Sequence, residues 1–520
     1  MATLQSVIPA TSKTSAIIVP PTDKTSAVFV SFADLAAQIT SVRSFLASLN
    51  LAPGSAVAIA LPNTLEFAIL FFAVTYSGYV AAPLNPMLTQ AEFEFYLADL
   101  ECPIAFVSKF KERANVINAV EKGGSVAVFE AEVLNGKVGI KTGTGQAVAF
   151  PANLAVTTSK ADDVALVLHT SGTTGRPKIV PLTHANLTTS ISNIVQTYKL
   201  TSADRSMLVM PLFHVHGLLC GFLAALSVQS GVIVPPRFSA STFWKEYVDY
   251  GATWYTAVPT IHQILLKGPA PFVGKKGPTV RFIRSCSSAL APATMKQLEE
   301  RFRAPVVEAY AMTEASHQMT SNDIPPGQRK VGSVGHAQGV VEVSILDQEG
   351  KEVPIGSEGE ICVRGANVTK GYRNNEAANK TSYTAEGYFR TGDQGKMDSD
   401  RYVYITGRIK ELINRGGEKI SPLELDAIML EHPAVAEAVS FAVPDDLYGQ
   451  EVHAAIVIKP NAKLTESEIK EFISRKVAKF KVPKKVYFTD IMPKTATGKI
   501  QRKNISEKFF QKDAPLKAKL

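Results

Sequence analysis

Short apolar runs alternate with longer helical patterns through most of the first three hundred residues. The apolar run 55–60 precedes a helical pattern over 66–76. Further strand-like runs are 164–168, 206–210, 231–234, 253–257 and 280–283. Strands that alternate with helices predict parallel sheets covered by helices, so this region is expected to have an α/β fold.

The pattern changes near residue 340. Residues 340–346 and 359–364 alternate apolar and polar positions, and a turn at Asp347–Gly350 follows the first run. This period of two residues predicts a small antiparallel barrel or sheet after the α/β region.

The pattern changes again after Arg408. Helical patterns over 422–432 and 465–479 enclose two strand-like runs, 434–443 and 451–458. These elements predict a small α+β domain of roughly 110 residues, an ordinary domain size. We therefore predict an N-terminal domain over residues 1–407 and a C-terminal domain over 408–520.

Composition restricts the class of protein. A chain of 520 residues with 46% hydrophobic and 20% charged residues is typical of a globular protein with more than one core. Its four cysteines form no CxxC pair, which argues against a structural zinc site or a disulfide framework and favours a reducing compartment. The most apolar stretch, 67–74, is too short to span a membrane and predicts a buried helix.

Positive charge gathers at the C-terminal end. Residues 471–520 hold fourteen Lys and Arg against four Asp and Glu, within a chain of net charge +8. Such a segment attracts nucleic acid or an anionic cofactor, or forms a solvated face. Because no helix-turn-helix, zinc-finger or RNP-type motif accompanies it, nucleic acid is disfavoured as the primary partner.

A candidate phosphate-binding loop follows the apolar run 164–168. It reads Thr170-Ser171-Gly172-Thr173-Thr174-Gly175-Arg176-Pro177-Lys178. Its glycines let backbone N–H groups approach phosphate oxygens, its hydroxyls add donors, and Lys178 adds charge. It lacks the P-loop spacing, so taken alone it is also compatible with an ordinary loop.

Two further segments carry groups suited to a nucleotide. In 308–314, Tyr310 can stack on a base, Thr313 can bind a phosphate oxygen, and Glu314 can bind Mg²⁺. Asp393, after Gly392, can accept hydrogen bonds from ribose hydroxyls. Without further context, the first segment is also compatible with a capped helix and the second with a plain turn.

Three segments remain. Residues 407–418 contain Lys410 and Gly416–Gly417 at the predicted domain boundary, where a hinge or a charged linker fits. Lys499 lies in a basic loop that is able to carry charge into a site on another domain. His214 and His216 are two residues apart and share no helical face, which argues against a simple metal pair.

Together, and in this order, these motifs resemble the acyl-adenylate-forming superfamily, which includes acyl-CoA synthetases, firefly-type luciferases and peptide-synthetase adenylation domains. The resemblance covers nearly the whole chain. It implies an α/β fold with a large N-terminal domain of two α/β subdomains plus a small β-barrel, and a small mobile α+β C-terminal domain. It also implies ATP, Mg²⁺ and CoA as cofactor and substrates.

The resemblance assigns roles to particular residues. It implies Lys499, Thr313 and His214 as catalytic residues, Glu314 as the Mg²⁺ ligand, Lys410 as the hinge, and Gly416 and Gly417 along the CoA path. It implies ATP and AMP binding by Thr170, Ser171, Gly172, Thr173, Thr174, Lys178, Ser288, Glu308, Ala309, Tyr310, Thr313, Asp393, Arg408 and Lys499. Asn414 stands where several relatives have a second lysine, so no thiolation role is assigned to it.

The acid is predicted from the segment 281–292, which places Arg284 before a Ser-Cys-Ser-Ser turn. The predicted substrate residues are His214, Arg284, Ser285, Ser287 and His317. A buried arginine needs a partner, and a second substrate carboxylate supplies one, although a structural ion pair is the alternative. These segments resemble those of plant and fungal oxalate–CoA ligases, which implies oxalate as the substrate.

Two other readings stay open at this point. The first is a peroxisomal medium-chain fatty-acid or 4-coumarate-like CoA ligase with an apolar pocket. The second, of another class, is an RNA-binding protein that uses the basic C-terminal segment. The terminal Ala518-Lys519-Leu520 resembles a peroxisomal address, so we expect a peroxisomal import receptor as a partner. The expected location is the peroxisome, with the cytoplasm as a second compartment.

Overall fold

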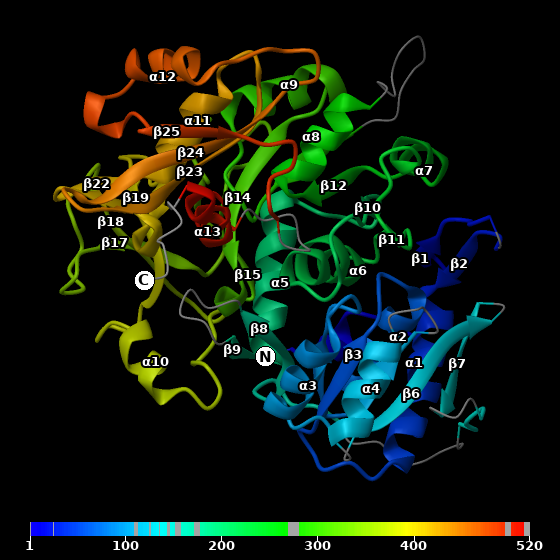
Figure 1. Ribbon diagram of the computed structural model, residues 1–520. Helices are drawn as coiled ribbons and strands as arrows, with labels where there is room; N and C mark the ends of the chain where they lie inside the picture. The colour runs from blue at the N-terminus through cyan, green and yellow to red at the C-terminus, as the bar shows by residue number, and fades with distance from the viewer. Residues whose placement is uncertain are drawn as a thin grey trace.

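The computed structural model describes residues 2–23, 25–108, 113–123, 126–134, 136–142, 146–150, 158–170, 177–268, 280–494 and 501–513. Two predominantly parallel sheets, each with antiparallel pairs at its edges, form the larger part of the molecule (Figure 1). None of the helices in these ranges combines the length and the apolar character that a membrane span needs.

The first sheet has seven strands in the order β7-β6-β5-β3-β4-β8-β9. Their bounds are β3 Ala56–Ala60, β4 Val80–Pro83, β5 Ile104–Val107, β6 Ala127–Leu134, β7 Lys137–Thr142, β8 Val164–Thr170 and β9 Lys178–Thr183. β3 pairs in parallel with β4 and β5, whereas β8 and β9 form an antiparallel pair. The strand predicted at 55–60 is confirmed, and so is the one at 164–168.

The second sheet has nine strands in the order β16-β15-β14-β13-β12-β10-β11-β1-β2. Their bounds are β1 Ser15–Val19, β2 Val28–Ser31, β10 Arg205–Met207, β11 Gly231–Ile233, β12 Trp254–Ala257, β13 Phe282–Ser285, β14 Val306–Met312, β15 His317–Ser321 and β16 His336–Ala337. The strand predicted at 280–283 begins two residues later than expected. This shift places Arg284 and Ser285 in the sheet itself.

Helices cover both sheets. Their bounds are α1 Phe32–Ser48, α2 Leu65–Tyr76, α3 Gln90–Asp99, α4 Arg113–Gly123, α5 His184–Tyr198, α6 Ala224–Ser227, α7 Phe243–Asp249, α8 Pro259–Lys267 and α9 Pro292–Phe302. A short 3₁₀ helix η1 (Leu4–Ser6) and a π-helix η2 (His216–Leu223) accompany them. The helix predicted at 66–76 is α2, which is buried along almost its whole length.

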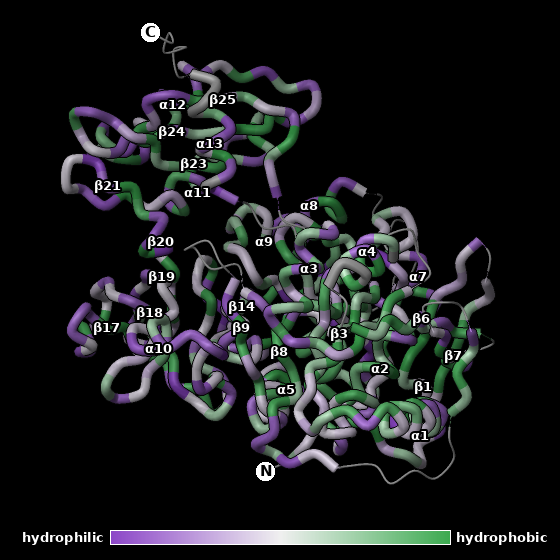
Figure 2. Tube along the Cα trace, turned by 60° about the horizontal axis from the view of Figure 1, so that its bottom comes forward, coloured by the Kyte–Doolittle hydropathy of each residue, from purple (hydrophilic) through white to green (hydrophobic). Residues whose placement is uncertain are grey.

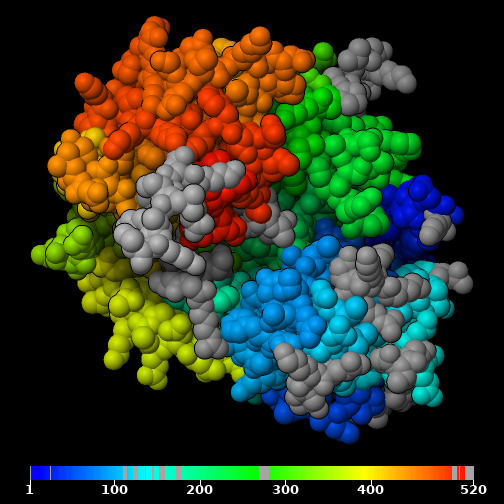
Figure 3. Space-filling model, viewed as in Figure 1, coloured from blue at the N-terminus to red at the C-terminus, as the bar shows by residue number. Residues whose placement is uncertain are grey.

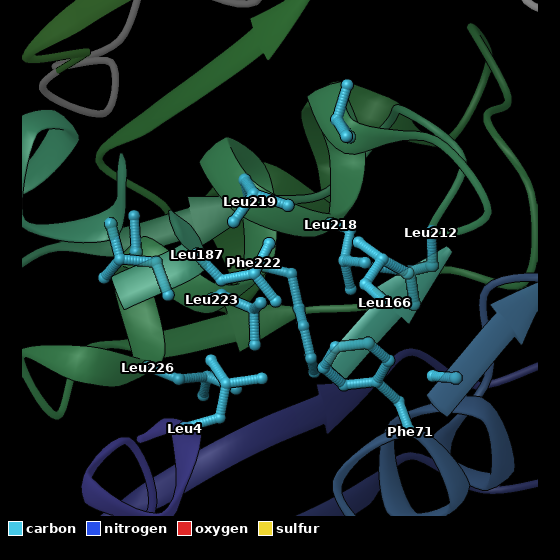
Figure 4. Close-up of a cluster of buried hydrophobic side chains, with 14 of the residues drawn as sticks. Leu4, Phe71, Leu166, Leu187, Leu212, Leu218, Leu219, Phe222, Leu223 and Leu226 are labelled. Carbon is cyan, nitrogen blue, oxygen red and sulfur yellow. The ribbon is translucent and has the colours of Figure 1, made fainter. Parts of the chain in front are cut away.

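Local sequence fixes where the helices begin. Thr64 caps α2 by accepting a hydrogen bond from Phe67 N, and Thr183 forms a capping box at the start of α5. η2 and α2 then meet in the main hydrophobic core. There Leu218, Phe222 and Leu223 gather with side chains from other elements (Figure 4). The labelled partners are Leu4, Phe71, Leu166, Leu187, Leu212, Leu219 and Leu226.

The alternating pattern after residue 340 forms an antiparallel sheet of four strands. Their order is β17-β18-β19-β20, with bounds Glu342–Leu346, Gly359–Arg364, Phe389–Met397 and Val403–Arg408. The predicted sheet is therefore present, and its closure into a barrel stays a prediction. A short helix α10 (Glu376–Ser382) precedes β19.

The C-terminal elements form a lobe of their own, joined to the rest through β20 (Figure 2). Its strands are β21 Ile413–Arg415, β22 Glu418–Ile420, β23 Val435–Asp445, β24 Gly449–Ile458 and β25 Lys485–Phe488, and its helices are α11 Pro422–Leu430, α12 Glu466–Ser474 and α13 Arg502–Asp513. The predicted α+β region is confirmed, with both helices ending earlier than expected. The boundary at 407/408 stays a prediction.

The lobe has its own core. Ile413, Leu425 and Ile456 lie in one buried cluster, and Phe509 of α13 stacks on Tyr487 on the other side of the lobe sheet. In the space-filling view the lobe, orange to red, adjoins the green and yellow parts of the N-terminal region (Figure 3).

Candidate active site

The predicted phosphate loop begins at the end of β8. Thr170 and Lys178 are opposite partners in the β8–β9 ladder, so the loop between them closes a hairpin. Ser171, Gly172, Thr173 and Thr174 lie outside the described residues. The Lys178 ammonium lies 4.4 Å from the ring centroid of Tyr372, a residue of the connection between β18 and α10.

Three residues from distant motifs meet beside β14. The Tyr310 hydroxyl donates to Asp393 Oδ2 over 2.5 Å, and Arg408 Nε donates to Asp393 Oδ1 over 2.9 Å. Asp393 and Arg408 face each other across β19 and β20. The alternative of a plain turn does not hold for Asp393, because it lies inside β19, whose pairing with β20 fixes its position. This carboxylate is suited to accept hydrogen bonds from a ribose.

Glu314 lies in a 3₁₀ helix, η3 (Thr313–Ala315), directly after β14. Its Oε1 accepts a hydrogen bond of 2.8 Å from the Tyr372 hydroxyl. Burial raises the pKa of Glu314, and the hydrogen bond and the charges of Arg408 and Lys178 oppose this rise. Thr313 stands at the start of the same helix, so both predicted phosphate-side residues occupy one turn.

A hard cation at this turn would need ligands besides the protein. Within the described ranges, no three His, Cys, Asp or Glu side chains gather where they could hold a metal ion by themselves. Glu314 offers one carboxylate, whose negative charge is partly offset by Arg408 and Lys178. This fits Mg²⁺, which is commonly held by one or two carboxylates together with substrate phosphates and water.

Glu308 and Ser288 differ from Glu314 in their surroundings. Glu308 Oε1 accepts a hydrogen bond of 2.9 Å from Leu290 N, and burial raises the pKa of Glu308 to about 8. Glu308 therefore ties β14 to the segment that follows β13. Ser288 is exposed and donates to Ser287 O, while Ala309 is buried within β14. Nucleotide contact by these three residues stays a prediction.

Arg284 lies on β13 with no exposed surface. Its Nε donates to the Tyr198 hydroxyl over 2.7 Å, Nη1 to Thr256 Oγ1 over 3.1 Å, and Nη2 to Gln318 Oε1 over 3.2 Å. Within the described residues no carboxylate pairs with it. The alternative of a structural ion pair therefore finds no support, and contact with the acid stays a prediction.

His216, rather than the predicted His214, contacts the residues predicted to bind the acid. Its Nδ1 is 3.0 Å from Ser287 Oγ, and its Nε2 is 2.6 Å from Thr256 Oγ1. Its ring stacks on His317, with centroids 5.1 Å apart and 23° between the planes. His214 is half-buried in the turn before η2, where its backbone N–H donates to Pro211 O.

The turn that presents His317 is strained. Ser316 and His317 have φ values of 49° and 91°, a region that residues with a Cβ seldom adopt. Ser287, opposite, also has a positive φ of 74°. Ser285 is buried on β13, and its hydroxyl has no hydrogen-bond partner within the described residues. The structure thus brings Ser287, His317 and Arg284 into contact with His216.

Two family models match the chain. Residues 12–373 match the model of the AMP-binding enzyme, and residues 424–499 match the AMP-binding enzyme C-terminal domain. The chain belongs to the AMP-binding enzyme family.

Relatives of known activity cover most of this AMP-binding enzyme. An oxalate–CoA ligase of Saccharomyces cerevisiae is 49% identical and covers 89% of the chain and 88% of its own length. An oxalate–CoA ligase of Arabidopsis thaliana is 48% identical, and the match covers 88% of this chain and 89% of that protein. Among solved structures, ATP-bound MatB from Rhodopseudomonas palustris superimposes with a TM-score of 0.87 at 29% identity, covering 98% of this chain and 99% of that one.

The remaining predicted residues of this AMP-binding enzyme belong to the C-terminal lobe. Lys410 is exposed in η4 (Ile409–Glu411), the short 3₁₀ helix directly after β20. Gly416 and Gly417 form the turn between β21 and β22, with φ values of 58° and 93°. Lys499 lies outside the described residues. The hinge, CoA-path and catalytic roles of these residues stay predictions.

Proposed function

We propose that this AMP-binding enzyme is an AMP-forming CoA ligase whose acid is oxalate. The observation that carries the proposal is the polar cluster of His216, Ser287 and His317 above the buried Arg284 guanidinium. Such a pocket suits a small dianion, whereas a fatty or aromatic acid needs apolar walls. The identity to two oxalate–CoA ligases supports the same acid.

In the proposed first step, a carboxylate oxygen of oxalate attacks the α-phosphorus of ATP and pyrophosphate leaves. Asp393 and Tyr310 hold the nucleoside, and Lys178 and the loop before it hold the outer phosphates. Mg²⁺ at Glu314 supplies charge neutralisation between phosphates and acid when bound. Thr313 and Lys499 stabilise the charge that grows on the α-phosphate, which is a task of position and electrostatics.

In the second step, the thiol of CoA attacks the carbonyl carbon of oxalyl-AMP and AMP leaves. We assign the thiol path to Gly416 and Gly417 of the β21–β22 turn, with rotation of the lobe at Lys410 between the two steps. His214 stands at the mouth of the acid pocket. Because the lobe has its own core, it is able to rotate as one body.

The test is the rate of AMP formation with ATP, Mg²⁺ and CoA. Oxalate is compared with malonate, sulfoacetate, octanoate and 4-coumarate, since a sulfoacetate–CoA ligase of Cupriavidus necator is 36% identical. We expect a preference for oxalate. His216→Ala should raise the KM for oxalate by about tenfold or more, because it removes a hydrogen-bonding group and its contact with His317.

The matched control is His336→Ala. The ring of His336, on β16, pairs with Asp323 and packs against Tyr402, so its loss should leave the KM for oxalate unchanged. Preference for octanoate or coumarate would keep the ligase and refute oxalate. RNA binding without turnover of any acid would favour the other class of function.

We also propose import into peroxisomes through Ala518, Lys519 and Leu520, which resemble a receptor-read address. A fluorescent fusion that preserves this end should reach peroxisomes, and deletion of the three residues should leave it in the cytoplasm with its ligase activity intact. Cytoplasmic fluorescence of the complete fusion would refute the proposal.

A further inference from the structure

A chain of hydrogen bonds runs from Arg284 to the edge of the acid pocket. Arg284 Nη1 is 3.1 Å from Thr256 Oγ1, which is 2.6 Å from His216 Nε2. His216 Nδ1 is in turn 3.0 Å from Ser287 Oγ. The two inner members, Thr256 and His216, are buried, whereas Ser287 is only partly buried.

The first member fixes the direction of this chain. A guanidinium only donates hydrogen bonds, so Thr256 Oγ1 must accept from Arg284. A hydroxyl that accepts from Arg284 can still either donate to His216 Nε2 or accept from it. The contact of 3.5 Å between Arg284 Nη1 and Nε2 favours donation, because the guanidinium can only donate and Nε2 must then accept. Nε2 acts as the acceptor, and the neutral ring carries its proton on Nδ1. Nδ1 therefore donates to Ser287 Oγ, which leaves the Ser287 proton free for a ligand.

Charge supports the same direction. Arg284 Nη1 lies 3.5 Å from His216 Nε2, so a proton on Nε2 would point at a like charge. The acceptors around Arg284 are neutral. Burial raises the pKa of the Tyr198 hydroxyl to about 12, so this group stays protonated. Tyr198 accepts from Arg284 and donates to Gln318 Oε1 over 2.9 Å.

We propose that Arg284 is a positioning residue that acts through Thr256 and His216 to make Ser287 a hydrogen-bond donor to the substrate carboxylate. The identity of the acid in this proposal rests on the proposed function, whereas the tautomer of His216 is independent of it. Arg284 thereby contributes its charge and its donor-only character from behind the pocket, and its side chain need not touch the acid.

The first measurement is made on the wild-type protein without substrate. Nitrogen-15 NMR of histidine-labelled enzyme, with the His216 signals assigned by their loss in His216→Gln, reports which ring nitrogen carries the proton. We expect Nδ1 protonated and Nε2 bare. A proton on Nε2 would overturn the proposal; that result is read from the wild-type protein, and His216→Gln serves only to assign the signals.

Variants of Arg284 then distinguish the effect of a donor-only cation from the effect of side-chain size. Arg284→Lys keeps a donor-only cation and should keep the Nδ1–H tautomer, whereas Arg284→Met should let Thr256 accept from Nε2 and shift the proton there. Thr256→Val should raise the KM for oxalate by about tenfold and leave the KM for ATP unchanged. Thr256→Ser, which keeps the hydroxyl, should have the wild-type KM for oxalate.

The outcomes distinguish the two proposals. An unchanged tautomer in folded Arg284→Met, or equal loss in Thr256→Val and Thr256→Ser, would refute the positioning role. If the expected tautomers were found in an enzyme that does not use oxalate, oxalate would be refuted as the substrate. The direction of the hydrogen-bond chain from Arg284 to Ser287 would still be supported.

Discussion

At the scale of single residues, the clearest testable consequence concerns Glu308. Its pKa is raised by burial from 4.5 to about 8, so the folded state binds a proton that the unfolded state releases between these values. Stability should therefore fall as pH rises from about 4.5 to about 8. Glu308→Gln keeps the acceptor for Leu290 N and removes this proton, so the melting temperature should fall less between pH 6 and pH 8 than in wild type.

The control for this prediction is Glu300→Gln, an exposed residue of α9 that pairs with Lys296. It should keep the wild-type dependence on pH. An equally steep dependence in Glu308→Gln would show that another group is responsible.

Residues also show the limit of what the sequence alone predicts. Tyr310, Glu314 and Asp393 could be found because their motifs are contiguous, and the structure brings Tyr310 and Asp393 into contact. His216 could not be chosen over His214, because both stand in one short segment. Only the π-helix that begins at His216, and the pairing of β12 with β13, bring His216 to Thr256 and Ser287.

At the scale of elements, α13 is fixed to the lobe by Arg502. This side chain pairs with Asp426 of α11 at 2.6 Å and with Glu411 of η4 at 3.1 Å, and it donates to Ser440 O. Arg502→Met leaves the buried Asp426 carboxylate without its cation, which typically costs about 3–5 kcal/mol. Amide hydrogen exchange should therefore accelerate in α11, β23 and α13 and remain unchanged in the N-terminal sheets.

The matched control is Lys508→Met, on the exposed side of the same helix. It should leave exchange in α11 and β23 unchanged. Unaltered exchange in Arg502→Met would mean that apolar contacts of Phe509 hold α13 without the ion pairs.

Elements with a local pattern were predictable, and elements defined by distant partners were not. The run 359–364 coincides with β18, whose central residues Ile361, Cys362 and Val363 are all buried. The two N-terminal strands were missed: β1 and β2 pair with each other, but β1 joins the sheet only through β11, more than two hundred residues later. Such a pairing leaves no signal in a short window of sequence.

At the scale of the whole molecule, the residues predicted to bind ATP and Mg²⁺ and the proposed catalytic lysine belong to different regions. Tyr310, Asp393 and Glu314 come from the N-terminal region, whereas Lys499 belongs to the C-terminal one. If Lys499 acts on the α-phosphate, Lys499→Ala should leave the Kd for ATP within about twofold. The rate of oxalate-dependent pyrophosphate exchange should fall by about a hundredfold to a thousandfold, the usual cost of removing one preorganised charge.

The same variant should still convert synthetic oxalyl-AMP and CoA into the thioester, because the proposed mechanism places that step in a second position of the lobe, without Lys499. Lys463→Ala, an exposed lysine of the same lobe, is the matched control and should retain both steps. If Lys499→Ala lowered the rates of both steps equally, the lysine would stabilise the lobe and would have no specific role in the first reaction. A weaker Kd for ATP would instead place Lys499 among the ground-state contacts, and rotation of the lobe would then no longer be needed to explain its role.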